Sequence, residues 1–274
     1  MNTNNITINA DQDLDAQQQH LSSIKYDLRI TNLARFIFKK VIQCHPELDP
    51  GSRNNTLDSR PRGNDKQIKL IDIGAGNGLF LKFFKEKGLH VSGIELEKEN
   101  VENMLKDTQL SGVDIRLGDI TQLTGHEEYD VVIASDVIEH IEQDETAIDH
   151  LWSFVAPGGI LIVTVPAHAH LYGRRDEAWG HFRRYDKQIL KAKVEGLKFG
   201  SIEFLTFWNT IGYFVYFLFE RILHKPINET MRYSTSMPSR MVQYFLDKIL
   251  RVEEVVGGTL WGLTLVAGVR KIKP

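Results

Sequence analysis

From residue 67 onward, short apolar runs alternate with segments whose apolar residues recur at helical spacing. The runs are apolar throughout, which is typical of parallel strands in an α/β sheet covered by helices on both faces. The pattern predicts strands at Ile68–Ile73, Val91–Glu95, Asp114–Leu117, Val131–Ala134, Ile160–Val165, Ser201–Leu205 and Leu260–Val269. It predicts helices at Leu79–Lys87, Lys98–Thr108, Glu142–Val155, Thr206–Arg221 and Pro238–Glu253.

The first 66 residues follow a different pattern. Residues 1–20 are polar and predict a disordered tail, without the basic start and apolar stretch of a secretory signal. Residues 21–43 carry apolar side chains at helical spacing and predict a helix that packs on the main domain. Residues 44–66 are rich in Pro, Gly, Asn and Arg and predict an exposed inserted loop. The main domain is then 67–274, with 207–257 as a helical insertion or lid.

Charge and cysteine content exclude some classes of partner and compartment. The 33 basic and 36 acidic residues give a net charge of -3, so no global basic field exists for nucleic acid and no nucleic-acid partner is expected. The single cysteine, Cys44, excludes an intramolecular disulfide and fits the reducing cytoplasm.

A glycine turn follows the first expected strand, at Gly74-Ala75-Gly76-Asn77-Gly78. Glycine permits positive φ and close backbone approach to a ligand, and the following helix presents free N–H groups. Asp72, near the end of the strand, would order the turn or meet a cationic group of the ligand. The dinucleotide fingerprint requires glycine where Leu79 stands, which favours S-adenosylmethionine over a pyrophosphate cofactor. A plain strand–helix turn remains an alternative.

Acidic residues follow the next two expected strands. Glu95 lies about 20 residues after the turn, where a carboxylate accepts from ribose hydroxyls in either type of nucleotide cofactor. Asp119 would accept from the adenine amino group while Ile120 packs on the ring. The alternatives are a solvated strand-end acid for Glu95 and a cap for Asp119.

Several motifs in order resemble the class I S-adenosylmethionine-dependent methyltransferases of the type 11/12 group. They are Asp72–Gly78, Glu95, Gly118–Asp119, Asp136–His140 and Pro157–Gly159. His181-Phe182-Arg183-Arg184-Tyr185 also resembles the His-x-Arg-Arg-Tyr element of a bacterial subgroup. The resemblance implies a Rossmann-like, seven-stranded, mostly parallel sheet with an antiparallel last strand and a helical insertion before it. It implies S-adenosylmethionine as cofactor, with contacts from Asp72, Gly74, Ala75, Gly76, Gly78, Glu95, Asp119, Ile120 and Asp136.

Methyl transfer requires a positioned nucleophile and, where needed, a base. The base candidates are His140, His168, His170 and His181, each of which is alternatively an ordinary polar histidine. The substrate candidates are Arg183, Arg184 and Tyr185, whose arginines would bind a phosphate or carboxylate, or else pair with Asp176 or Glu177 to fix the loop. No metal site is predicted, because His168 and His170 with Asp176 lack a convincing further ligand.

Residues 204–219 carry no charge and span roughly 24 Å as a helix, short of the ~30 Å hydrocarbon core. Three interpretations stay open: a buried core helix, a lid over a greasy substrate, or an interfacial element giving peripheral contact with the inner membrane through 204–225. The expected acceptor is therefore a small molecule or a lipid-linked compound. The rival functions are an NAD(P)-dependent oxidoreductase and a non-catalytic S-adenosylmethionine-binding module.

Overall fold

The computed structural model describes residues 27–46, 67–223 and 236–273. The predicted tail at 1–20 and most of the predicted loop at 44–66 lie outside these ranges.

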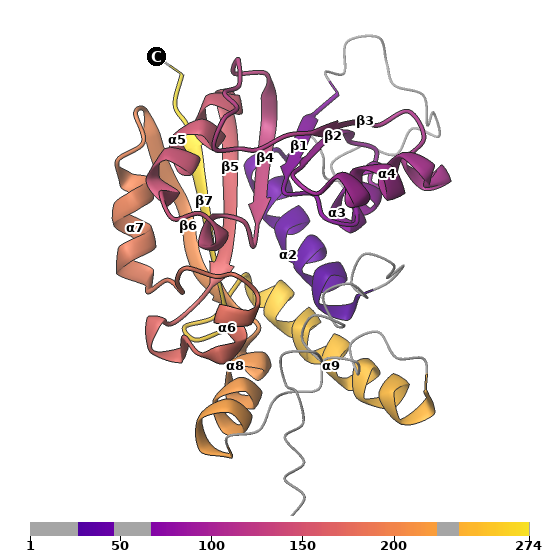
Figure 1. Ribbon diagram of the computed structural model, residues 1–274, viewed down its shortest axis with the longest axis vertical. Coiled ribbons are helices and arrows are strands. Elements are labelled where there is room, and N and C mark those ends of the chain that lie inside the picture. Colours follow the sequence, from indigo (N-terminus) through magenta and orange to yellow (C-terminus); the bar gives the residue numbers. More distant parts are fainter. Residues whose placement is uncertain (1–26, 47–66, 224–235, 274) are drawn as a thin grey trace, which may run out of the picture.

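A seven-stranded sheet forms the centre of the structure, with strand order β3-β2-β1-β4-β5-β7-β6 (Figure 1). Strands β1 to β5 run parallel to one another, and β7 is antiparallel to both of its neighbours, β5 and β6. This confirms the predicted Rossmann-like sheet with an antiparallel last strand. The strands are β1 Lys69–Ile73, β2 His90–Glu95, β3 Asp114–Leu117, β4 Tyr129–Ser135, β5 Val155–Pro166, β6 Gly200–Trp208 and β7 Thr264–Lys271.

Helices cover both faces of the sheet because successive residues of each strand point to opposite sides. In β1, Leu70 joins the core cluster on the side of α2 (Leu28–Cys44), α3 (Leu79–Glu86) and α4 (Lys98–Lys106). Ile71 and Ile73 join the cluster formed with α5 (Asp144–Phe154) and α7 (Lys187–Glu195) on the other side. The two buried clusters fix the sheet between its helical layers.

Further helices lie beyond the carboxyl edge of the parallel strands, below the sheet in Figure 1. Helix α6 (Arg174–Ala178) belongs to the connection between β5 and α7. Helix α8 (Thr210–Tyr216), the π-helical turn η5 (Phe217–Ile222) and α9 (Met237–Val256) lie between β6 and β7. None of the helices within the described residues is long and apolar enough to cross a membrane.

The predicted helix from Thr206 is wrong over its first three residues, which are the end of β6. Thr206 pairs with Val266 and Trp208 with Thr264 of β7. An unbroken apolar run does not separate a buried strand from a helix, so periodicity misplaced the boundary. Asn209 makes the change of direction, because it adopts a left-handed conformation (φ 67°) and its side chain accepts a hydrogen bond from Gly212 N.

The last strand is shorter than predicted, because it begins at Thr264 and not at Leu260. Of the three interpretations of residues 204–219, the buried core helix fits least well, because most side chains of α8 and η5 are exposed or half-buried. Over α8 and η5 only Tyr216 is buried, and Phe214 keeps 58% of its surface accessible.

Candidate functional site

The glycine turn joins β1 to α3 at the carboxyl edge of the sheet. Gly74, Gly76 and Gly78 have φ angles of 79°, 54° and 75°, which glycine adopts at no steric cost. A Cβ on Gly74 would lie 2.4 Å from Val137 Cγ2, so the turn packs tightly against the segment after β4. A Cβ on Gly76 would meet nothing within 4 Å. Gly76 therefore faces open space, where the backbone of the turn is accessible to a ligand.

The acidic residue at the end of β2 is tied to the glycine turn. Glu95 Oε2 accepts a hydrogen bond from Gly76 N at 2.6 Å, and Oε1 accepts one from Glu97 N at 2.9 Å. After β3, Asp119 Oδ1 accepts from Thr121 N at 2.8 Å, and Ile120 is buried. The structure thus brings the predicted cofactor residues together along neighbouring strand ends, because parallel strands place their carboxyl ends at one edge.

Asp72 is a buried acid at the same edge. Desolvation, followed by the nearby charge of Glu95, raises the pKa of Asp72 from its ordinary 3.8 to about 8. Its Oδ1 has no hydrogen-bond partner among the described residues. With a pKa of about 8, the Asp72 carboxyl group is mostly protonated at pH 7.

Replacing this acid should change how stability depends on pH. Between pH 4 and pH 8 the unfolded chain loses the Asp72 proton while the native state keeps it, so the native state loses stability as pH rises. The slope is at most about 1.4 kcal/mol per pH unit. We expect Asp72→Asn to gain stability relative to the native chain as pH rises from 5 to 7, measured by urea unfolding. Parallel stability curves for the two proteins would contradict this.

A cavity of about 400 Å³ adjoins the end of β4. Asp136 lines it just after β4, in a left-handed conformation (φ 54°), and its carboxylate pairs with Arg29 Nη2 at 2.7 Å. Arg29 comes from the first turn of α2, which crosses one face of the sheet to reach this edge. Asp136 therefore lies both at the edge of the sheet that carries the predicted cofactor residues (the cofactor edge) and in the wall of the cavity.

Three ligating side chains meet on the wall of the cavity: Glu139, His140 and His181. One potential ligand atom from each lies within 4.8 Å of the others, and the two imidazole rings are 4.6 Å apart at 85°. Burial and then the neighbouring His181 lower the pKa of His140. Burial and then the charge of Asp136 raise the pKa of Glu139 well above its usual range.

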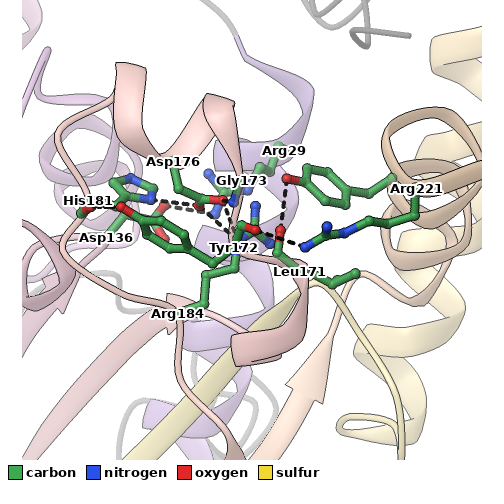
Figure 2. Close-up of polar contacts among 10 residues, drawn as sticks. Arg29, Asp136, Leu171, Tyr172, Gly173, Asp176, His181, Arg184 and Arg221 are labelled. Carbon is green, nitrogen blue, oxygen red and sulfur yellow. Dashed lines mark hydrogen bonds and ion pairs between the residues drawn. The ribbon is translucent and has the colours of Figure 1, made fainter. Parts of the chain in front are cut away.

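Asp176 organises the loop that carries His181. Its carboxylate is 1% exposed and lies 3.0 Å from His181 Nδ1, while both oxygens accept from Arg184 Nε at 2.8 and 2.9 Å (Figure 2). Burial opposes ionisation, but the His181 hydrogen bond and the Arg184 charge lower the pKa of Asp176. Since the carboxylate is the acceptor, Nδ1 of His181 carries a proton in this contact, and Nε2 is the ring nitrogen left for another partner.

Other predicted site residues make contacts that fix the loop. Arg183 pairs with Asp144 at 3.0 Å, and the buried Tyr185 hydroxyl donates to the same carboxylate at 2.7 Å. His168 does not line the cavity; its ring stacks on Phe207, and its Nε2 lies 3.0 Å from the Gly262 carbonyl. These contacts favour the loop-fixing interpretation of Arg183 and Tyr185 and a packing role for His168.

The part of the chain that forms this edge of the sheet is similar to a known protein family. Residues 33–195 match the model of a family described as a methyltransferase domain. The chain belongs to the methyltransferase-domain family. The match includes the glycine turn and the cavity residues from Asp136 to Arg184, whereas Leu28 and Arg29 precede it and α8 and α9 follow it.

Individual relatives match over shorter stretches. The ubiquinone biosynthesis O-methyltransferase of Rickettsia canadensis is 31% identical over 100 residues, covering 36% of this chain and 42% of the relative. The "probable (S)-tetrahydroprotoberberine N-methyltransferase 2" of Papaver bracteatum is 31% identical over 116 residues, covering 39% and 32%. The chain thus spans less than half of the length of these relatives.

A solved methyltransferase supports the fold over almost the whole chain. The plantazolicin methyltransferase BpumL, in complex with a pentazolic desmethylPZN analog and SAH, aligns with a TM-score of 0.58 at 10% identity. The alignment covers 96% of this chain and 91% of that protein. At this identity the likeness concerns the fold.

Two cavity residues, Arg29 and Glu139, were not among the site residues predicted from the sequence. Glu139 adjoins the predicted His140, so its place in the Asp136–His140 motif was an available signal. Arg29 had none, because it reaches Asp136 from 107 positions away along the chain.

Proposed function

We propose that this protein is a methyltransferase that transfers the methyl group of S-adenosylmethionine to an acceptor bound in the cavity beyond β4. The observation that carries the proposal is the position of Asp136. It is the last of the predicted cofactor residues along the carboxyl edge of the sheet, and it also lines the cavity. A methyl donor along that edge would present its reactive end to an acceptor in the cavity.

The charge along the edge supports a cationic donor. Acidic side chains follow β2, β3 and β4 at Glu95, Asp119 and Asp136. Asp119 and Asp136 would attract a sulfonium compound and repel a pyrophosphate, whereas Glu95 suits the ribose of either cofactor. This disfavours the NAD(P)-dependent oxidoreductase, in agreement with Leu79 at the position where dinucleotide-binding turns carry glycine.

The cavity supports an amphipathic acceptor. Its wall from α8 and α9 is largely apolar and includes Ile211, Val215, Val242, Leu246 and Leu250. Sites of this kind hold an apolar ligand and orient it by a few polar groups. We infer an acceptor with an apolar body, of the lipid-linked or hydrophobic small-molecule class.

The opposite wall offers polar groups for the head of the acceptor. Arg184 Nη1 and Trp179 Nε1 are buried donors without a partner among the described residues, and both residues line the cavity. The Arg184 guanidinium is held by Asp176 and by the Tyr216 ring, 4.5 Å from its centroid. A phosphate, carboxylate or hydroxyl of the acceptor would satisfy both donors.

His140 and His181 lie beside these donors, and we propose that one of them accepts the proton of the nucleophile as a general base. Transfer forms a bond from the nucleophile to the methyl carbon and breaks the C–S bond, whose electron pair stays on sulfur. The proton leaves the nucleophile toward the histidine pair, where Asp176 fixes the orientation of His181. General-base assistance of this kind contributes roughly 10²–10⁴-fold to the rate.

Label transfer from S-adenosylmethionine to cell extracts tests the proposal. We expect a labelled product in the lipid or apolar small-molecule fraction, formed by the native chain and lost in Glu95→Ala. Leu105→Ala, an exposed change on α4 away from the edge, should label normally. Binding of the cofactor without labelling of any fraction would support the non-catalytic binding module instead.

We also propose peripheral membrane contact through residues 204–225. Phe214, Phe217 and Leu218 are exposed on the described part of this segment. Apolar side chains beside a cavity with an apolar wall suit an enzyme that takes its acceptor from a lipid surface.

Sedimentation with vesicles containing anionic lipids measures this contact. We expect Phe214→Ser with Leu218→Ser to reduce the bound fraction several-fold, because burying each side chain contributes about 1.5–3 kcal/mol. Leu105→Ser is the matched control, since Leu105 is 62% exposed on α4. Equal binding of the native chain and the double variant would contradict the membrane contact.

A further inference from the structure

We propose that Glu139, His140 and His181 form a binding site for a divalent transition-metal cation, with Zn²⁺ as the preferred ion, on the wall of the acceptor cavity. The inference rests on the proposed function for the role of the ion and on the geometry for its existence. It differs from the sequence-based expectation, which considered His168 and His170 and predicted no metal site.

Glu139 is the first observation. Its side chain is 0% exposed, and neither carboxylate oxygen has a hydrogen-bond partner among the described residues. An isolated buried carboxyl group is costly, and each such group in a native structure requires an explanation. The residue lines the cavity beside the two imidazoles, so a cation shared with them would compensate the buried carboxylate through one of its oxygens.

The two histidines provide the second observation. Their rings are 4.6 Å apart, and one ligand atom from each lies within 4.8 Å of the Glu139 carboxylate. Ligands on a tetrahedral Zn²⁺ ion, with bonds of about 2.0–2.1 Å, lie about 3.3 Å apart. Binding would therefore draw the three ligand atoms together by up to about 1.5 Å.

The surroundings of His181 match those of a metal ligand. A metal-bound histidine usually donates its other ring N–H to a carboxylate, which fixes the tautomer and the ring. Asp176 accepts from His181 Nδ1 at 3.0 Å and leaves Nε2 for an ion. Asp176 is in turn held by Arg184 Nε and by Gly173 N, so the orientation of His181 is fixed before an ion binds.

The donor set selects the class of ion. Two imidazoles and one carboxylate suit Zn²⁺ and neighbouring first-row ions, whereas Mg²⁺ prefers oxygen ligands and retains water. Three protein ligands leave a position open for a further ligand, as in catalytic zinc sites.

An ion at this place has a defined role in the proposed reaction. In the open position it would bind an oxygen of the acceptor and lower the pKa of that hydroxyl, whose proton passes to water. The oxygen then forms the bond to the methyl carbon, and the C–S electron pair stays on sulfur. With the ion bound, the site favours an oxygen nucleophile, and the imidazoles act as ligands in place of the base role proposed above for the metal-free chain.

Calorimetric titration of the chelator-treated full chain with Zn²⁺, Co²⁺ and Mg²⁺ tests the site. We expect one Zn²⁺ per chain, bound far more tightly than Mg²⁺. Zn²⁺ affinity should fall at least 100-fold in Glu139→Gln and in His181→Ala. His170→Ala should bind normally, because His170 is an exposed histidine of the same loop outside the cluster.

The absorption spectrum of bound Co²⁺ is a second readout that needs no variant. Intense visible bands are expected from a four- or five-coordinate site, and weak bands like those of the hydrated ion would overturn the proposal. Absence of stoichiometric Zn²⁺ binding, or equal affinity in all three variants, would also overturn it. Titration of the metal-free chain with SAH separates the proposed methyltransferase function from the proposed cation site. If this chain does not bind SAH, the methyltransferase function is contradicted and the cation site is not.

Discussion

Substitution of Gly76 by alanine should abolish most cofactor binding while the protein stays folded. A Cβ at this position meets no protein atom within 4 Å. The added methyl group would therefore project into the space where we expect the cofactor to contact the backbone of the glycine turn. Overpacking costs about 1–3 kcal/mol, which corresponds to roughly 5–150-fold weaker binding of SAH. The φ angle of 54° adds a loss of stability of about 1–2 kcal/mol. Calorimetry with SAH and thermal unfolding measure the two effects.

Gly88→Ala is the matched control for this change. Gly88 has a φ angle of 83°, and a Cβ there also meets nothing within 4 Å, but it lies between α3 and β2 at the opposite edge of the sheet. We expect the same loss of stability with unchanged SAH binding. Equal binding by the two variants would remove the glycine turn from the cofactor site.

Substitution of Asp176 by alanine should cause the largest loss of stability among the changes considered. Arg184 would stay buried without its partner, and breaking a buried ion pair in this way costs about 3–5 kcal/mol. His181 would lose the acceptor of its Nδ1–H. We expect the midpoint of thermal unfolding to fall by roughly 6–20 °C, together with most of the activity.

Glu177→Ala separates this effect from a general weakening of α6. Glu177 is the next residue of the same helix and is exposed. Its removal should change the free energy of unfolding by less than about 0.5 kcal/mol. If the two variants unfold together, Asp176 does not anchor the loop.

The cofactor edge was predictable from the sequence because each of its parts follows a strand directly. The turn at Gly74–Gly78, Glu95 and Asp119 are local features, and parallel strands bring them to one edge whatever the details of packing. The seven-stranded, mostly parallel sheet and its antiparallel last strand followed from the motif resemblance, and the structure confirms them.

The acceptor side was much less predictable, because its geometry depends on contacts between distant segments. Arg29 pairs with Asp136, which lies 107 positions further along the chain. Helices α8 and α9 form one wall of the cavity, and no sequence motif indicates that they do so. The arginines after β5 have two plausible partners in the sequence, and only the structure shows that Arg184 pairs with Asp176. The end of β6 was not predicted correctly, because the apolar residues 204–208 are compatible with a strand and with a helix.

The most direct test of the central claim is calorimetric titration of the full chain with SAH and with NAD. One SAH per chain, with no binding of NAD, is the predicted result, because the acidic edge and the glycine turn suit a sulfonium-derived nucleoside. Binding of NAD without binding of SAH would contradict the account.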